Sequence, residues 1–148
     1  MVDFVTVEKR SNIMRGSRSK NTRPELRVRK LLHGLGYRYR IHYREAPGKP
    51  DIAFPGRRKA ILVHGCFWHQ HDDPSCIVAR KPSSNTGYWS DKFSQNKRRD
   101  QRTIAALQKA GWEVLTVWEC EVGRHDLPNQ LARFVGPTRS TSSSPFRR

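Results

Sequence analysis

The 148-residue chain has no long apolar run, few acidic residues and only three cysteines. A membrane-spanning helix needs about 20 consecutive apolar residues, and no stretch of this sequence approaches that length. The segment from Met1 to Arg18 also lacks the continuous apolar stretch of a secretory signal, so we expect a cytoplasmic protein. Because three cysteines cannot all pair with one another, metal ligation or free thiols are favoured over disulfide bonds.

The shortage of acidic side chains leaves the chain strongly positive. Lys and Arg number 29 against 13 Asp and Glu, which gives a net charge of +16. Such an excess favours a polyanionic partner, most simply nucleic acid, although an anionic membrane surface would attract it too. Since structural RNA-binding proteins are equally basic, the charge indicates a class of partner and not an activity.

The length suits one domain with a single modest core, which we expect at residues 21–136. Residues 1–20 are polar and basic, and they are predicted to form a flexible arm in which Arg18 and Lys20 contact a phosphate backbone. Residues 137–148 are rich in Ser, Thr, Pro and Arg, and they are predicted to form a disordered tail.

Hydrophobic periodicity predicts the order helix, three strands, helix, strand, helix. A capping box at residues 22–25 begins the first helix, and Gly34 and Gly36 end it. The order predicts one α/β layer system in which helices flank a mixed central sheet. The later elements are expected as strands at residues 37–41, 51–54 and 59–64, a long loop at 65–90, a helix at 91–109, a strand at 112–118 and a helix at 126–135.

The densest pattern in the chain is the run VHGCFWHQH at residues 63–71, which a further thiol follows closely. Three thiolates and one imidazole suit a tetrahedral structural zinc site. The four candidate ligands are Cys66, His71, Cys76 and Cys120. The alternative is three buried thiols beside a surface histidine, but four soft ligands in so short a chain favour zinc.

A second group of residues has the chemistry of phosphodiester hydrolysis. Asp51 is expected at a sheet end and Glu25 in the first helical turn, where a carboxylate can hold Mg²⁺ while phosphate oxygens and water complete its shell. His64 and His69 are candidates for activating water, since imidazole titrates near neutral pH. Taken one at a time, each has a commoner explanation: a helix cap for Glu25, a turn for Asp51 and a surface position for His69.

Aromatic side chains lie in the same region of the sequence. Phe67 and Trp68 fall inside the predicted zinc loop, and Trp89 falls in the same long loop. Exposed rings on a basic protein favour stacking on bases or wedging between them. The alternative, which is equally compatible with the pattern, is a small apolar cluster beneath the loop.

A basic run on the second predicted helix is the last candidate. Lys97, Arg98 and Arg99 would be a solvated helix face in isolation, but beside the other features phosphate contacts are favoured. Asp100 is an acid among bases, and it would orient a histidine or pair with an arginine.

These stretches together resemble the very short patch repair endonucleases. The resemblance runs from about residue 10 to about residue 122, and HGCFWH with a later WEC is its most specific feature. The stretches that carry it are RSKNTRPE at 18–25, PGKPD at 47–51, HGCFWHQH at 64–71, YW at 88–89, NKRRD at 96–100, GW at 111–112 and WEC at 118–120.

The resemblance implies a restriction-endonuclease-like core at residues 21–136 and an enzyme that nicks double-stranded DNA 5′ to the thymine of a T:G mismatch. Such mismatches arise when 5-methylcytosine deaminates. A cytosine-5 DNA methyltransferase and downstream repair enzymes are therefore implied as functional partners. The protein is expected to act as a monomer in the bacterial cytosol, associated with the nucleoid.

By position, the resemblance makes Asp51 the Mg²⁺ carboxylate and the backbone carbonyl of Val63 a further Mg²⁺ ligand. His69 would be the general base. The residues implied to support the metal, the phosphate or the water are His64, Glu25 and Asp100. Those implied to hold structural Zn²⁺ are Cys66, His71, Cys76 and Cys120, and those implied to intercalate beside the mismatch are Phe67, Trp68 and Trp89.

Two departures and two alternatives accompany this prediction. Val63 replaces a threonine of the best-known member, which a backbone ligand tolerates, and the stretch between His71 and Cys76 is longer. One alternative is a sequence-specific restriction-type endonuclease of the same fold that cuts an unmismatched site. The other is a zinc-stabilised DNA-binding protein without activity.

Overall fold

The structure, a computed structural model, describes residues 21–71, 76 and 84–138. The predicted arm at residues 1–20, with Arg18 and Lys20, and all but the first two residues of the predicted tail at 137–148 lie outside these residues. The elements are α2 (Arg23–Gly34), β1 (Arg40–Ile41), β2 (Ile52–Phe54), η1 (Pro55–Arg57), β3 (Lys59–His64), α3 (Cys66–His69), α4 (Thr86–Lys109), β4 (Glu113–Trp118), η2 (Glu119–Glu121) and α5 (Leu127–Val135).

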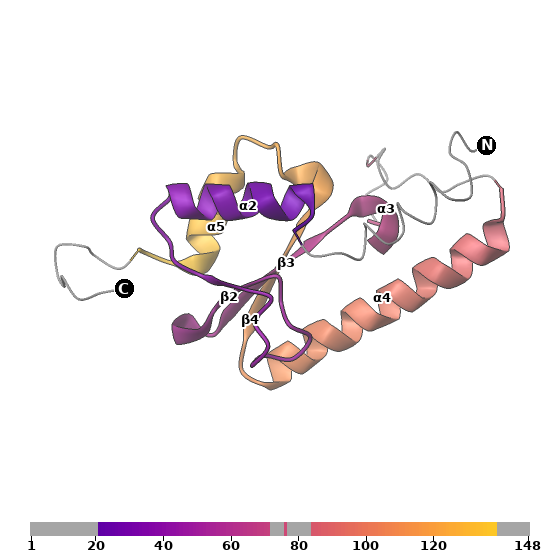
Figure 1. Ribbon diagram of the computed structural model, residues 1–148, viewed down its shortest axis with the longest axis horizontal. Coiled ribbons are helices and arrows are strands. Elements are labelled where there is room, and N and C mark those ends of the chain that lie inside the picture. The colour runs from indigo at the N-terminus through magenta and orange to yellow at the C-terminus, as the bar shows by residue number, and fades with distance from the viewer. Residues whose placement is uncertain (1–20, 72–75, 77–83, 139–148) are drawn as a thin grey trace.

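The described strands form one mixed sheet in the order β1-β2-β3-β4. β2 pairs antiparallel with β1 and with β3, whereas β3 pairs parallel with β4. A parallel pair needs a long crossover connection, and α4 supplies it. Figure 1 shows α2 and α5 on one face of the sheet and α4 along the other. This confirms the predicted α/β fold with helices flanking a mixed central sheet.

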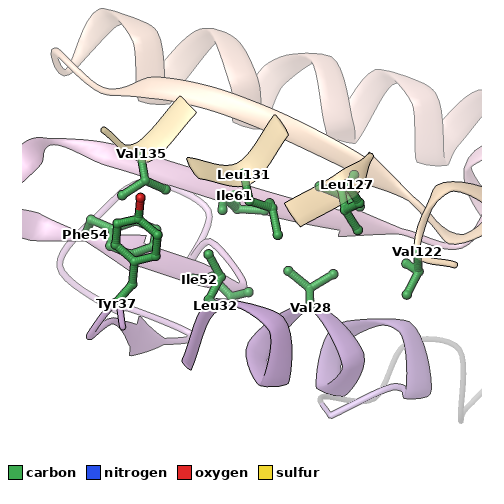
Figure 2. Close-up of a cluster of buried hydrophobic side chains, with 11 residues drawn as sticks. Val28, Leu32, Tyr37, Ile52, Phe54, Ile61, Val122, Leu127, Leu131 and Val135 are labelled. Carbon is green, nitrogen blue, oxygen red and sulfur yellow. The ribbon is translucent and has the colours of Figure 1, made fainter. Parts of the chain in front are cut away.

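The larger core lies between the sheet and the α2–α5 pair (Figure 2). Val28 and Leu32 lie one turn apart on α2 and are fully buried. Leu127 and Leu131 are likewise buried one turn apart on α5. Each such side chain contributes roughly 1.5–3 kcal/mol when it leaves water. This packing fixes α2 on the sheet and therefore fixes the place of Glu25 in its first turn.

A smaller core lies between the opposite face of the sheet and α4. Ala60 and Leu62 of β3 pack there with Leu107 of α4. Because side chains alternate along a strand, His64 shares the face of Leu62 and points toward α4. The end of β3 is therefore the place where a histidine from the sheet can meet residues of α4.

The prediction for residues 65–90 was wrong in two respects. A short helix, α3, lies within the predicted loop, and α4 begins at Thr86, well before the predicted start at residue 91. Trp89 and Phe93 stand one turn apart and are both buried against Phe67 of α3. Burial of this aromatic pair extends α4 toward its N-terminus, although the polar residues around the pair indicated a loop.

The first predicted strand, at residues 37–41, is shorter than expected, since β1 holds only Arg40 and Ile41. Tyr37 is buried in the larger core, and its hydroxyl donates to the carbonyl of Gly136. The hydroxyl of Tyr39 donates to the carbonyl of Arg29 at 3.1 Å. Side-chain contacts thus hold this segment where a strand ladder was predicted.

None of the helices formed by the described residues is long and apolar enough to cross a membrane.

Substitution of Gly48 by alanine is expected to destabilise the fold. Gly48 has φ +72°, and a Cβ at this position would overlap Cγ2 of Thr103 on α4. The strained backbone and the overlap together should lower the free energy of unfolding by about 1–3 kcal/mol in chemical denaturation. Thr103→Ala in the Gly48→Ala background should recover part of this loss, because it removes the overlap but not the backbone strain.

The matched control for this change is Gly123→Ala. No atom lies within 4 Å of a Cβ built at Gly123, so its free energy of unfolding should stay within about 0.5 kcal/mol of the parent value. Equal stability of Gly48→Ala and Gly123→Ala would show that the turn before β2 does not constrain the fold.

Candidate functional site

The carboxylate of Asp51 lies at the start of β2 and bonds to the neighbouring strand. Its Oδ2 accepts the backbone N–H of Val63 on β3 at 2.8 Å. Burial raises the pKa of Asp51 to about 6, the hydrogen bond from Val63 opposes this rise, and the negative charge of Glu25 adds to it. A buried carboxylate beside a second one is an arrangement that a bound cation would stabilise.

Glu25 supplies that second carboxylate from the first turn of α2. The side chain of Thr22 accepts the backbone N–H of Glu25 and caps the helix, as predicted, whereas the Glu25 side chain bonds to other partners and does not complete the predicted capping box. The Glu25 carboxylate is only 4% exposed, and its Oε2 contacts Arg29 Nη2 and, at 2.7 Å, His42 Nε2. Glu25, His42 and Asp51 each offer a ligand atom, and these atoms lie within 4.8 Å of one another.

A second polar group lies across the end of β3. Nδ1 of His69 is 2.5 Å from Oδ2 of Asp100 on α4, and the ring of His69 stacks on that of His64 at 4.0 Å between centroids. His64 Nε2 is 3.9 Å from Oδ1 of Asp100. Burial, followed by the nearby His69, lowers the pKa of His64 to about 4, while Asp100 opposes the shift. His64 is therefore a neutral imidazole at physiological pH.

The local fold explains how these side chains meet. β3 ends at His64, and Gly65 is the N-cap of α3, so His69 follows one helical turn later. Its backbone N–H donates to the carbonyl of Gly65 at 3.1 Å. α4 passes this end of the sheet and presents Asp100 to both histidines.

The four predicted zinc ligands come together at the start of α3. The ligand atoms of Cys66, His71, Cys76 and Cys120 all lie within 4.8 Å of one another. His71 Nδ1 is 3.7 Å from Cys66 Sγ and 3.4 Å from Cys120 Sγ. Ordinary Zn–S and Zn–N lengths give edges of about 3.6 Å in a tetrahedron, so the donor set and its spacing fit zinc.

Residues at the end of β4 hold this cluster in place. Cys66 is fully buried, and burial raises the pKa of its thiol. Glu119 Oε1 accepts the backbone N–H of Cys66 at 3.3 Å, and the backbone N–H of Cys120 points to Cys66 Sγ at 3.4 Å. The ring of His71 stacks on Trp118 with 4.2 Å between centroids. The cluster therefore ties α3 to the sheet.

The aromatic residues form one cluster between α3 and α4. Phe67 lies 5.0 Å from Trp68 and 5.4 Å from Trp89, measured between ring centroids. Trp89 is 3% exposed, whereas Phe67 and Trp68 are partly exposed. Asn96 Nδ2 donates to the carbonyl of Trp68 at 2.8 Å and so links α3 to α4. Phe67, Trp68 and the exposed Tyr88 thus form the accessible edge of a cluster that has Trp89 inside it.

The basic run lies on the same helix as Asp100. Arg98 and Arg99 are exposed, and Lys97 is partly buried. All three cations precede Asp100 on α4. Arg18 and Lys20, which were predicted to share this role, lie outside the described residues.

His42 is the residue of this site that sequence reasoning missed. Ile41 lies opposite Ile52 in the antiparallel register of β1 and β2. Extending this register by one residue places His42 opposite Asp51, and the His42 N–H does donate to the Asp51 carbonyl at 3.1 Å. If the two strands on either side of the turn at residues 46–50 had been predicted to pair as a hairpin, His42 would have been placed opposite Asp51.

Comparison with known proteins identifies relatives that cover most of the chain. Residues 2–75 match the family described as DNA mismatch endonuclease Vsr. The type II nicking enzyme V.XorIIP of Xanthomonas oryzae is 51% identical over 122 residues, which are 82% of this chain and 88% of that enzyme. The type II nicking enzyme V.NmeAIP of Neisseria meningitidis is 42% identical over 82% of this chain and 85% of that enzyme. The DNA mismatch endonuclease Vsr of Escherichia coli is 38% identical over 131 residues, which are 88% of this chain and 82% of that enzyme.

Proposed function

Because the chain belongs to the DNA mismatch endonuclease Vsr family and is a DNA endonuclease, we propose that it nicks duplex DNA 5′ to the thymine of a T:G mismatch, with Mg²⁺. The observation that carries the proposal is the end of β3. There the N–H of Val63 bonds to Asp51, and the next residue, His64, stacks on His69. Two consecutive residues of β3 thus contact the candidate cation ligand Asp51 and the candidate base His69.

Asp51 and the backbone carbonyl of Val63 would hold the Mg²⁺ ion. In an antiparallel ladder the N–H and C=O of one residue face the same neighbouring strand, and the Val63 N–H already faces Asp51. Oxygen ligands of this kind suit Mg²⁺, and the nearby Glu25 adds negative charge. The chemistry that a bound Mg²⁺ supplies is polarisation of the scissile phosphate and stabilisation of the leaving alkoxide.

His69 is proposed as the general base. Asp100 engages Nδ1 of His69, which leaves Nε2 as the atom that accepts a proton from water. The oxygen of that water forms a bond to phosphorus while the bond from phosphorus to the leaving oxygen breaks. The charge of Asp100 stabilises the imidazolium that results, and the stacked, neutral His64 holds the His69 ring in its plane.

Zn²⁺ on Cys66, His71, Cys76 and Cys120 would have a structural role. The cluster fixes both ends of α3, which lies between Cys66 and His71 and carries His69 and the exposed aromatic edge. Stiffening this segment would hold the base and the DNA-contacting rings at a constant separation.

Selectivity for the mismatch is proposed to come from the partly exposed aromatic edge, Phe67 and Trp68. A T:G wobble stacks less well than a Watson–Crick pair, so inserting a ring beside it costs less than elsewhere in the duplex. Trp89 would support these two rings from within the cluster and contact the bases if the cluster opens on binding. Lys97, Arg98 and Arg99, with Arg18 and Lys20, would contact phosphates.

The biological setting is also part of the proposal. T:G mismatches that arise from deamination of 5-methylcytosine would link the enzyme to a cytosine-5 DNA methyltransferase and to the repair enzymes that process the nick. Because the lesion is asymmetric, we propose that the protein acts as a monomer, in the bacterial cytosol and at the nucleoid.

Paired duplexes that differ in one base provide the direct test. With Mg²⁺, the protein should nick a T:G duplex at least about a hundredfold faster than the T:A duplex of the same flanking sequence, because unstacking a paired base costs a few kcal/mol more. A library with randomised flanks would cover any sequence preference. Equal cleavage of T:G and T:A duplexes would favour the restriction-type endonuclease, and binding without any nicking would favour the DNA-binding protein.

A further inference from the structure

We propose that His42 is a positioning residue of the catalytic cation site and that its imidazole holds the carboxylate of Glu25 beside Asp51. The inference rests on the proposed Mg²⁺-dependent nicking, because it assigns how this chain fixes the second acid of that site. His42 itself would contact neither the DNA nor the reacting atoms.

Two donors from two different elements meet one oxygen of Glu25. His42 Nε2 lies 2.7 Å from Glu25 Oε2, and Arg29 Nη2 contacts the same oxygen. Arg29 belongs to α2 itself, whereas His42 follows β1, so the His42 bond ties the helix to the segment that precedes β2. The exposed fractions of the side chains are 14% for His42, 13% for Arg29 and 4% for Glu25, so water competes little for these bonds.

The backbone of His42 is shaped for this contact. Its φ of +46° lies in the left-handed region, which residues other than glycine seldom adopt. Its N–H donates to the carbonyl of Asp51 at 3.1 Å while its side chain reaches Glu25. One residue thus connects the backbone of the first acid to the side chain of the second. Strained conformations of this kind persist where contacts with the surrounding structure stabilise them, and they are common at functional sites.

The physical need for such a residue follows from burial. Glu25 and Asp51 are both negative and withdrawn from water, and the charge of Glu25 disfavours ionisation of Asp51. A buried carboxylate without donors would turn toward solvent or take up a proton. Because its neighbour Glu25 Oε2 is an acceptor, His42 Nε2 acts as a donor, and a neutral imidazole is sufficient for that. His42 and Arg29 would together keep the Glu25 carboxylate facing the cation.

Binding of Mn²⁺ to the full-length protein without DNA would test this role directly, with free Mn²⁺ followed by electron paramagnetic resonance. Loss of a residue that orients a metal-site ligand costs about 10–100-fold in affinity, so His42→Ala should weaken Mn²⁺ binding at least about tenfold. His42→Gln keeps a donor near the same place and should stay within about threefold of the parent. His33→Ala, an exposed histidine of α2, is the matched control and should bind Mn²⁺ as the parent does.

Nicking assays give the second measurement. His42→Ala should raise the Mg²⁺ concentration for half-maximal nicking by about tenfold, while the rate at saturating Mg²⁺ and the Kd for T:G DNA change little. Unchanged Mn²⁺ affinity in a His42→Ala protein that melts at a lower temperature would overturn the proposal and leave His42 a structural residue. His42→Gln as defective as His42→Ala would also overturn it, because the imidazole would then be a direct ligand. If the parent nicks no T:G duplex, the proposed function fails, yet the Mn²⁺ comparison among these variants still decides the role of His42.

Discussion

Asp51→Asn is expected to abolish nicking of a T:G duplex while the protein stays folded and bound to DNA. Asparagine keeps the size of the side chain, and its carbonyl oxygen can still accept the N–H of Val63. It removes the charge that would hold the cation and with it several kcal/mol of transition-state stabilisation. The single-turnover rate should therefore fall by about a thousandfold or more.

The stability of Asp51→Asn should rise although its activity is lost. Burial raises the pKa of Asp51 to about 6, so at neutral pH the ionised carboxylate is less favourable in the folded chain than in the unfolded one. Without added Mg²⁺, Asp51→Asn should therefore raise the free energy of unfolding, which urea denaturation measures. A gain in stability together with a loss of activity is typical of a charge that is kept for function.

The control for this substitution is Asp91→Asn, at an exposed acid on α4. It makes the same chemical change at a distance from Asp51 and should leave both nicking and stability close to the parent values. Normal nicking by Asp51→Asn would rule out Asp51 as the cation ligand, and loss of DNA binding in the same variant would mean that the substitution disturbs more than the cation site.

Cys66→Ser is expected to have the largest effect on structure. The parent should carry about one zinc per chain, and the variant should carry almost none, because a neutral hydroxyl replaces the most buried thiolate of a four-ligand site. Metal analysis of the purified proteins measures this. The free energy of unfolding should fall by at least about 3 kcal/mol, since zinc binding contributes directly to folding.

Cys66→Ser should also lose nicking activity, because the general base His69 would no longer be held in position. Cys66 opens α3 and His69 closes it, so release of the cluster frees the segment that carries the general base. His125→Ala, at an exposed histidine outside the cluster, should keep its zinc and its activity. A parent protein that contains no zinc would favour three free thiols, of which only Cys66 is buried, and neither the loss of stability nor the loss of activity would then be expected.

Some elements of this fold are visible in the sequence because local physics decides them. The apolar run at residues 59–64 has the length and composition of a central strand, and β3 has those bounds. Thr22, with Pro24 in the first turn, marks the start of α2 in the same way. Such elements need no information about their neighbours.

Other elements depend on partners that are remote in the sequence. The start of α4 follows from packing of Trp89 and Phe93 against Phe67, whereas the polar residues around Trp89 indicated a loop. The same packing decides exposure, since it buries Trp89 and leaves Phe67 and Trp68 at the edge. No local pattern distinguishes a buried ring from one that is free to meet a base.

The sequence by itself determined the types of chemistry that this protein carries: a large positive charge, three thiols and an imidazole for a soft metal, and carboxylates and histidines for hydrolysis. Only the tertiary structure decided which of these groups meet. The Glu25–His42–Asp51 group joins α2 to the hairpin of β1 and β2, and the His69–Asp100 pair joins α3 to α4. The physical reason is that hydrogen bonding and desolvation depend on distances in space. Those distances are fixed by the packing of helices on a sheet and not by separation along the chain.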